Sequence, residues 1–389
     1  MSVPPVTMRV AIDIRRAGDF GIGTYVRNIV NQFARTDSET EYLLIGQQLH
    51  LQQFDPLPDN FKLLEYESAP GSFHTHMHLP FLLRKHGVDI LHMPWFYAPA
   101  VVPSRLVITI HDLTDILTPP PGISATFQAG RLFFARRALN RADRILAVSH
   151  SSKRELSRAF GVPEEKIEVV YNALDERFLR EPMPEGADGI LERHAVTDPF
   201  VLYAGNIKPQ KNLPRLIEAF AVAKAELRDH PQYANLKLLL IGDSAEEHSD
   251  LRRAVLRSRV QADVRFLGFV PHPVLRVFYS RASAFLFPSL YEGFGLPPLE
   301  AMAHGAPVLT SSASSLPEVF SQAALLANPE NVFEIARGIR QILTEDDLRE
   351  TLIRRGYDLV QRYSWERSAE QVRELYRSVV GDAPSKSRA

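Results

Sequence analysis

The chain has 389 residues and a formal net charge of −1, and 45% of its residues are hydrophobic and 23% charged. This is the composition of an ordinary globular protein, and the length suits two domains of about 150–200 residues each. The near-zero net charge gives no reason to expect a nucleic-acid partner. The absence of cysteine excludes disulfides and thiolate chemistry and agrees with a reducing compartment.

Short apolar segments alternate with helical ones in the first half of the chain. We predict strands at residues 10–14, 42–45, 90–93, 106–110 and 144–148, with helices such as 24–34 and 127–140 between them. This alternation is typical of a parallel α/β sheet. The first residues do not form a signal peptide, and no run of about 18 apolar residues predicts a membrane span. We therefore expect a cytoplasmic protein.

The alternation breaks at 178–198, which is rich in proline, glycine and charge, and it resumes with the strand "PFVLYAGNI". The sequence thus predicts two Rossmann-like halves, an N-terminal domain at 1–178 and a C-terminal domain at 199–364. Residues 179–198 are predicted to form a linker with one short helix. A final amphipathic helix is expected at 363–380, followed by a disordered tail.

The most informative stretch is "FPSLYEGFGLPPLEAMAHGAPVLTS" at 287–311. It predicts a strand, a glycine-rich loop, a helix that opens at Pro297-Pro298, and a second strand. The backbone N–H groups of 293–296 then lie at a helix N-terminus that follows a parallel strand, an arrangement that binds phosphate.

Two glutamates, Glu292 and Glu300, flank this predicted anion site. Carboxylates are useful there only if they accept hydrogen bonds from hydroxyl groups, which a sugar and a ribose supply in pairs. The pattern therefore predicts a sugar–diphosphate–ribose ligand. The alternative is structural, with Glu292 capping the helix and Glu300 on a solvated face.

The stretch resembles the signature of glycosyltransferase family 4, which comprises retaining enzymes of the GT-B fold. Other segments that resemble the family occur in its order: "GIGTYVRN", "DILHMPW", "ITIHDL", "ADRILAVSHSSKREL", "IEVVYNALD", "YAGNIKPQKNLPRLIEAF" and "RFLGFV". The resemblance covers nearly the whole chain. It implies an α/β protein with two Rossmann-like domains facing across a cleft, and a C-terminal helix (365–381) that returns to the N-terminal domain.

The resemblance also implies roles for residues of the second half. Glu292 matches the glutamate that binds hydroxyls of the donor sugar, Glu300 the one that holds the ribose, and the backbone at Val270 the base-reading position. The backbone N–H groups implied to bind sugar and diphosphate are those of Phe294, Gly295 and Leu296.

Lys211 matches the lysine that neutralises the diphosphate as the glycosidic bond breaks. Many relatives carry an arginine directly after the glycine of this motif, where this chain has Asn206. Either Lys208 supplies the second positive charge, or the site relies on Lys211 alone. The alternative is that Lys211 is a solvated surface residue, as a single lysine in a sequence usually is.

In the first half, the glycines at 18, 21 and 23 do not fit the GxGxxG dinucleotide fingerprint, which disfavours a dehydrogenase. The resemblance implies instead that Gly21 and Gly23 approach the diphosphate and sugar. The alternative is a plain strand-to-helix turn. His111 in "ITIHDL" matches a histidine that lies beside the donor sugar. The alternative is that His111 is a structural residue whose hydrogen bonds are made within the protein, as is usual for a histidine at the end of a strand.

The run "HTHMH" at 74–78 resembles a metal-binding motif. The surrounding sequence favours a helix, however, and a helix does not place all three histidines on one face. The family needs no metal, so we expect neither a metal nor another cofactor. The nucleotide sugar is a substrate.

The segment 131–158 carries eight basic residues against Asp143 and Glu155. It is a candidate for contact with an anionic lipid surface or a polyprenyl-diphosphate acceptor, which would give the protein a peripheral position at the inner face of a membrane. The alternative is a solvated helix face.

Taken together, the sequence predicts a retaining glycosyltransferase that moves a sugar from a nucleoside diphosphate to a saccharide or lipid-linked saccharide in polysaccharide biosynthesis. Mannose and GDP are favoured as donor sugar and nucleotide. The alternatives are a sugar-nucleotide hydrolase or epimerase, a sucrose-type synthase, and a non-catalytic sugar-nucleotide sensor.

Overall fold

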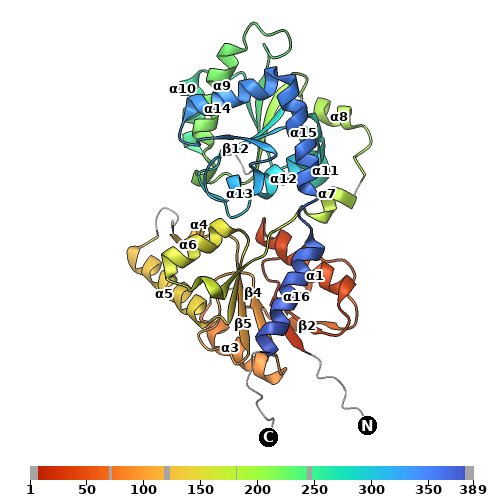
Figure 1. The fold of residues 1–389 in the computed structure, drawn as a ribbon, viewed down its shortest axis with the longest axis vertical. Helices are drawn as coiled ribbons and strands as arrows, with labels where there is room; N and C mark the ends of the chain where they lie inside the picture. The colour runs from red at the N-terminus through yellow and green to blue at the C-terminus, as the bar shows by residue number, and fades with distance from the viewer. Residues whose placement is uncertain (1–7, 70–71, 118–122, 181, 243–247, 382–389) are drawn as a thin grey trace. The chain divides into compact units, whose positions relative to one another are not determined.

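The computed structural model describes residues 8–69, 72–117, 123–180, 182–242 and 248–381 (Figure 1). It divides into two compact units. The first runs to Asn172 and takes up the chain again from Ser364, and the second runs from Ala173 to Tyr363. The tail predicted to be disordered lies outside the described residues. The helix α8 (Ala187–Arg193) forms within the stretch predicted as a linker and packs on α11 (His272–Arg281) of the second unit.

The first unit is built on a parallel sheet of seven strands in the order β3-β2-β1-β4-β5-β6-β7. The strands are β1 (Arg9–Asp13), β2 (Glu41–Gly46), β3 (Phe61–Glu65), β4 (Ile90–Met93), β5 (Arg105–Ile110), β6 (Arg144–Ala147) and β7 (Ile167–Val169). The five predicted strands are confirmed to within about two residues, as sequence patterns allow. The strands β3 and β7 were not predicted.

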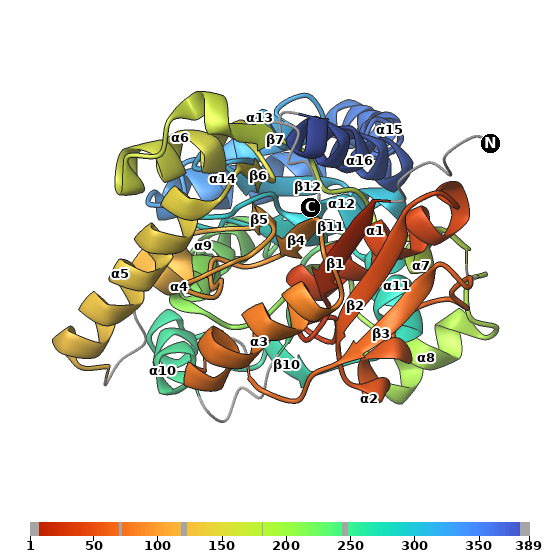
Figure 2. The same ribbon diagram turned by 90° about the horizontal axis from the view of Figure 1, so that it is seen from below.

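Helices cover both faces of this sheet (Figures 1 and 2). They are α1 (Ile22–Thr36), α2 (Gln48–Leu51), α3 (Phe73–Lys85), α4 (Thr114–Leu117), α5 (Ala125–Arg141), α6 (His150–Phe160), the 3-10 turn η1 (Glu164–Lys166) and α16 (Trp365–Gly381). Buried residues of α3, α5 and α6 join the strand side chains in one hydrophobic core. On the other face α1 packs against α16.

The C-terminal helix α16 returns to the first unit, as the sequence predicts. The hydroxyl of Tyr376 lies 2.5 Å from Nδ1 of the buried His92 on β4, and Ser368 donates a hydrogen bond of 2.7 Å to the Tyr171 carbonyl. Trp365 packs edge-on against the buried ring of Tyr25. The core on this face is therefore completed by α16, the last helix among the described residues.

The second unit has a parallel sheet of six strands in the order β10-β9-β8-β11-β12-β13. The strands are β8 (Phe200–Ala204), β9 (Lys237–Ile241), β10 (Val264–Gly268), β11 (Ala284–Phe287), β12 (Val308–Ser311) and β13 (Ala324–Ala327). Their residues are almost all apolar because helices cover the sheet on both sides.

The second unit's helices form two layers around this sheet (Figure 1). One contains α9 (Leu213–Glu226), α10 (Ser249–Ser258) and α14 (Val332–Thr344), and the other α11, α12 (Leu296–Ala303) and α15 (Asp346–Val360). The shorter elements are α7 (Glu176–Arg180), α8, the 3-10 turn η2 (Pro209–Lys211) and α13 (Leu316–Phe320).

Both sheets reverse their strand order beside their first strand, between β1 and β4 and between β8 and β11. In open parallel sheets of this kind, ligands bind at the carboxyl ends of the strands where the order reverses. The residues singled out in the sequence follow the carboxyl ends of β1, β5, β8, β10 and β11. The topology thus places them where such a fold holds a ligand.

Candidate functional site

The loops after β8 and β11 are joined by a buried asparagine. Asn212 adopts a left-handed conformation at φ 63°, and its side-chain amide donates hydrogen bonds to the carbonyls of Pro288 (3.1 Å) and Pro329 (2.6 Å). The N–H of Leu290 donates to the carbonyl of Gln210 at 2.8 Å. These bonds fix the position of η2, and with it Lys211, relative to the loop that carries Glu292.

Lys211 and Glu292 form an ion pair in which Nζ lies 2.5 Å from Oε1, and each side chain is only 12% exposed. The backbone of Glu292 is held by two serines after β12, since its carbonyl accepts hydrogen bonds from Ser314 (2.7 Å) and Ser315 (2.9 Å). The predicted phosphate-binding cation and the predicted sugar-binding carboxylate therefore meet. An anionic ligand at Lys211 would compete with Glu292 for the ammonium group.

The loop between Glu292 and α12 turns at Gly295, which has φ 98° and caps the helix. A Cβ atom there would lie 2.8 Å from Leu316 and 2.9 Å from Phe320, so only glycine fits. In the described part of the chain, the backbone N–H groups of Gly295 and Leu296 have no hydrogen-bond acceptor. They are free to donate to an anion, whereas Phe294 is buried and packs edge-on against Tyr363.

Glu300 lies one turn into α12 and is half-buried. The hydroxyl of Tyr279 donates a hydrogen bond of 2.9 Å to its Oε2. Burial, reinforced by the negative charge of Asp175, raises the pKa of Glu300 to about 7, against the smaller opposing effects of the Tyr279 hydrogen bond and Arg177. The carboxyl group can thus accept hydrogen bonds from hydroxyls, but it is partly protonated at neutral pH when the site is empty.

We expect Glu300→Gln to stabilise the empty protein at pH 8 and to have a much smaller effect at pH 5, close to the unfolded pKa of 4.5. The folded-state pKa lies above the unfolded value, so the favourable contribution of the protonated carboxyl is lost as pH rises through about 7. Glutamine keeps the shape and an acceptor for Tyr279 without the charge. The gain at pH 8 should be about 1–3 kcal/mol. Thermal unfolding of both proteins at the two pH values measures it, and an equal gain at pH 5 would contradict the explanation.

The other predicted donor-binding residues occupy the ends of β8 and β10. Lys208 is exposed on the same loop as Lys211, and the carbonyl of Asn206 accepts a hydrogen bond of 2.8 Å from Tyr203. Val270 follows β10 with its side chain buried. Their contacts with a donor remain predictions.

In the first unit, Gly21 and Gly23 open α1 after β1. Gly21 has φ 59°, and a Cβ atom on Gly23 would lie 2.5 Å from the carbonyl oxygen of Ala17. Gly23 is therefore required for close backbone packing. Gly21 has open space where a side chain would be, so its conformation alone requires glycine.

His111 follows β5, and the ring of Tyr25 packs edge-on against it at 5.0 Å. Burial, together with the positive charge of Arg16 and the proximity of His92, lowers the pKa of His111 to about 3. Its Nε2 is buried and has no hydrogen-bond partner within the described residues. A neutral imidazole with one unused nitrogen can hydrogen-bond a ligand hydroxyl, but it does not serve as a cationic acid at neutral pH.

The histidines at 74–78 lie on α3, as the sequence predicts. The rings of His74 and His78 are 4.9 Å apart, and Nδ1 of His76 instead accepts a hydrogen bond from the Ala100 N–H. No group of three or more His, Cys, Asp or Glu suited to a metal ion occurs among the described residues.

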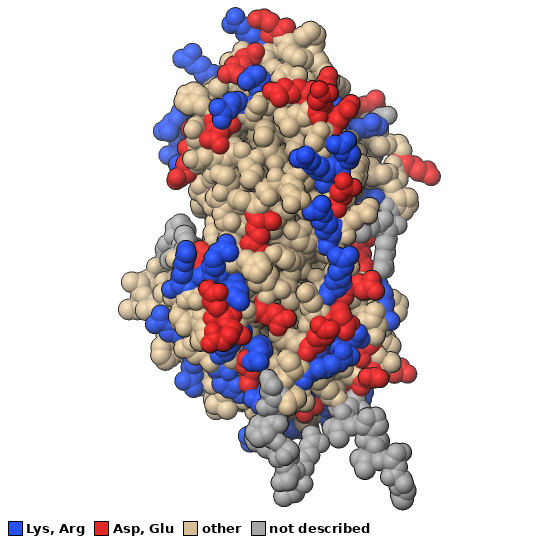
Figure 3. Space-filling model, viewed as in Figure 1, with Lys and Arg blue, Asp and Glu red and all other residues tan. Residues whose placement is uncertain are grey.

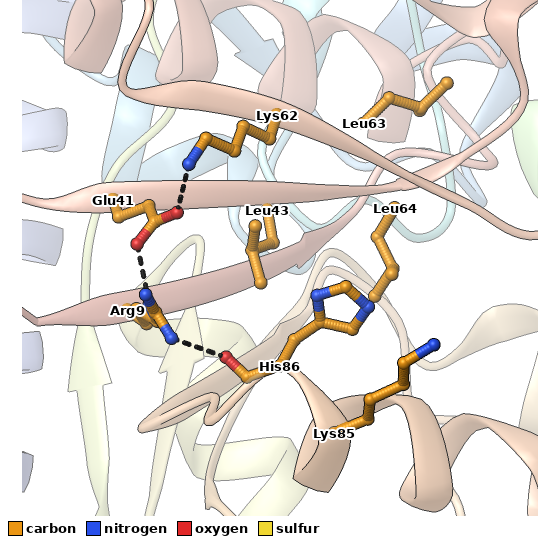
Figure 4. A pocket seen from close by; sticks show the side chains of 8 residues that line it. All are labelled: Arg9, Glu41, Leu43, Lys62, Leu63, Leu64, Lys85 and His86. Carbon is orange, nitrogen blue, oxygen red and sulfur yellow. Dashed lines mark hydrogen bonds and ion pairs between the residues drawn. The ribbon is translucent and has the colours of Figure 1, made fainter.

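A separate pocket opens at the amino ends of β1–β3 (Figure 4). Two of its three cations share one carboxylate, because Glu41 accepts hydrogen bonds from Lys62 at 2.7 Å and Arg9 at 2.6 Å. These two bonds lower the pKa of Glu41. The pocket lies at the end of the sheet opposite to the ligand-binding end, so we do not assign it to the donor.

Comparison with known proteins agrees with this geometry. Residues 21–178 match the family model described as Glycosyltransferase Family 4, and residues 192–359 match Glycosyl transferases group 1. The chain is 33% identical to O-antigen chain mannosyltransferase B of Escherichia coli over 76% of each chain.

The chain belongs to glycosyltransferase family 4.

This glycosyltransferase is also 27% identical to the O-antigen chain mannosyltransferase RfbU of Salmonella typhimurium, over 68% of this chain and 67% of that one. Among solved structures it resembles Anabaena HepE in complex with UDP and glucose, with a TM-score of 0.72 and 21% identity over 95% of this chain and all of that one. The glycosyltransferase WaaG aligns with a TM-score of 0.70 and 16% identity over 94% and 99% of the two chains. These likenesses show the GT-B fold.

Sequence reasoning missed the residues that hold the predicted ones in place in this glycosyltransferase. Tyr279 bonds Glu300, Asn212 joins the two loops, and Ser314 and Ser315 hold the backbone of Glu292. Asn212 was detectable in principle, because an asparagine directly before a helix often adopts positive φ. The other three gave no signal, since their roles depend on strands distant in sequence.

Proposed function

We propose that this glycosyltransferase transfers mannose from GDP-mannose to a saccharide or lipid-linked saccharide, with retention of the anomeric configuration, in polysaccharide assembly. The observation that carries the proposal is the Lys211–Glu292 pair beside the unbonded N–H groups of Gly295 and Leu296. Cation and N–H donors suit a diphosphate, and the carboxylate suits sugar hydroxyls. The names of the two O-antigen mannosyltransferases support mannose as the sugar.

In the proposed reaction, the bond between the sugar's anomeric carbon and the diphosphate oxygen breaks, and the acceptor hydroxyl forms its new bond on the same face. The hydroxyl proton passes to the departing phosphate oxygen. Lys211 stabilises the negative charge that develops on the leaving group, which is the largest contribution that such a site can make. Glu292 holds the sugar through its hydroxyls and Glu300 holds the ribose. We propose that no metal is needed, so that activity persists in a chelator.

A panel of thermal unfolding measurements with GDP, UDP, ADP and dTDP tests the donor site first. A ligand present at 100 times its Kd raises the free energy of unfolding by about 2.7 kcal/mol if it binds only the folded state. We expect a selective shift with GDP. The HepE structure contains UDP. A selective shift with UDP would therefore mean that the donor nucleotide is UDP rather than GDP, and it would still support the proposed donor site. No shift with any nucleotide would refute the donor site itself.

The alternatives differ in what happens to the donor. Turnover of the nucleotide sugar without acceptor would indicate a hydrolase or epimerase, and binding without turnover under any acceptor would indicate a sensor. The anomeric configuration of the product, read by NMR, tests retention, and an inverted product would refute the proposed same-face reaction.

A further inference from the structure

Two helices of the first unit expose an unusual number of large apolar side chains. Within the described chain, fifteen large hydrophobic residues are exposed, and five of them lie on α3 and α5. These five are Met77, Phe81, Phe127, Phe133 and Phe134, with exposed fractions between 44% and 65%. Clustered exposure of this kind in a globular unit indicates an interaction surface.

The five side chains lie on neighbouring helices. The ring of Phe134 on α5 contacts that of His76 on α3 at 5.4 Å, and Phe133 packs against Phe134 at 5.6 Å. Ala100 lies between the helices, because its N–H donates to His76 and its carbonyl accepts from Arg137. In Figures 1 and 2 both helices lie on the same side of β4 and β5.

Both helices direct these residues away from the sheet. The buried residues Leu79 and Leu83 of α3 and Ala135, Ala138 and Leu139 of α5 belong to the same core. Met77 and Phe81 are four residues apart and so share one side of α3, roughly opposite Leu79 and Leu83. In α5 only three of 17 residues are buried, so most of this helix faces outward.

The charge of these helices is of one sign. The 30 residues of α3 and α5 include no aspartate or glutamate and six arginines or lysines: Arg84, Lys85, Arg131, Arg136, Arg137 and Arg141. Elsewhere, charged side chains of both signs are interspersed, as the face in Figure 3 shows. The side chains of Arg84, Lys85 and Arg136 make no hydrogen bond or ion pair in the described part of the chain. They are available to bind anions outside the protein.

In the structure, several basic residues of the segment 131–158 bond to other parts of the first unit. Arg141 is paired with Asp143, Arg144 donates to the Asp143 carbonyl, and Lys153 donates to the Ile167 carbonyl. These side chains stabilise the unit itself. The unpaired cations and the exposed rings lie instead on α3 and α5. The predicted segment contains Phe133, Phe134 and Arg136, but it includes neither Phe127 nor any residue of α3.

We propose that the outward faces of α3 and α5, with Met77, Phe81, Phe127, Phe133, Phe134 and the cations Arg84, Lys85, Arg136 and Arg137, form a surface that binds an anionic lipid bilayer. Rings and thioether enter the boundary between headgroups and acyl chains, and the cations bind the headgroups. Charge complementarity selects this occupant, because a second copy of the same face would bring like charges together. The inference goes beyond the proposed function and does not depend on the donor nucleotide.

Flotation of the full chain with vesicles tests the proposal. We expect binding to vesicles of phosphatidylglycerol and phosphatidylcholine, weakening as salt is added, and little binding to phosphatidylcholine alone. Phe133→Ser with Phe134→Ser should weaken binding about tenfold or more at every salt concentration. Arg84→Gln with Arg136→Gln should weaken it roughly fivefold per residue at low salt only. The control is Phe333→Ser on α14, which removes an even more exposed ring (74%, against 63% for Phe133 and 44% for Phe134) and should change nothing.

The variants change exposed residues, so we expect them to fold normally. A midpoint of thermal unfolding equal to that of the wild-type protein checks this. Wild-type protein that stays unbound to anionic vesicles, or a double phenylalanine variant that binds as well as Phe333→Ser, would overturn the proposal. So would a dimer in solution that the double variant dissociates, because a second copy would then cover the face. GDP binding read on the same samples keeps this test separate from the donor proposal, which concerns the second unit.

Discussion

Lys211→Met is expected to lower turnover at least about 100-fold while the protein stays folded, because one preorganised donor to a developing anion contributes that much. Methionine keeps most of the length of the side chain and removes the charge together with the N–H donors. Because Lys211 lies 2.5 Å from Glu292, the variant also leaves that carboxylate without its partner. Steady-state kinetics with saturating donor, together with thermal unfolding, separate loss of catalysis from loss of structure.

Two further variants sharpen this result. Lys208→Ala distinguishes the two possibilities left by Asn206, since a small effect means that Lys211 acts alone and a large effect means that Lys208 supplies a second charge. Arg228→Ala removes an equal charge from an exposed ion pair elsewhere in the second unit and serves as the control. Near-normal turnover of Lys211→Met would defeat the assignment of the diphosphate site.

Glu292→Ala should also lower turnover at least about 100-fold, but for a different reason, and nucleoside-diphosphate binding distinguishes the two residues. Removing Glu292 removes the acceptor for the sugar hydroxyls and frees the Lys211 ammonium from its competing carboxylate. Binding of the nucleoside diphosphate without its sugar should therefore stay unchanged or become tighter. Calorimetric titration of the two variants with GDP and with GDP-mannose measures the difference.

Glu292→Gln provides the matched comparison, because it keeps the volume and removes the charge. We expect it to bind the diphosphate as Glu292→Ala does and to turn over faster than that variant, since the amide oxygen still accepts a hydrogen bond. Diphosphate binding that weakens in both Glu292 variants would contradict the division of roles between sugar and diphosphate.

The sequence predicted the fold well because its strands are apolar and buried on both faces. A run such as "LKLLLI" admits few other readings, and Pro297 with Gly305 marks the ends of α12 within two residues. Short strands gave weaker signals. The three residues of β7 and the alternating "FKLLE" of β3 were not predicted, because short runs of residues near a sheet edge do not stand out from loops.

The candidate site was predictable where one segment carries it. Gly295, Leu296 and Glu300 follow one another through a single loop and helix, so their proximity is a matter of local geometry. The ion pair of Lys211 and Glu292 joins residues 81 positions apart, and only the order of β8 and β11 in the sheet brings them together. The pKa values of Glu300 and His111 were equally inaccessible, because burial depends on what the rest of the chain packs against them.

The return of α16 to the first unit has a consequence for biosynthesis. A ribosome makes residues 173–363 before it makes the helix that fills the groove beside Tyr25 and His92. During that interval the His92 ring lacks its Tyr376 partner and the α1 face lacks its cover. The nascent first unit is then a site for chaperones or aggregation, and we expect a fragment that stops before residue 364 to be poorly soluble, whereas the second unit needs no later segment to complete its core.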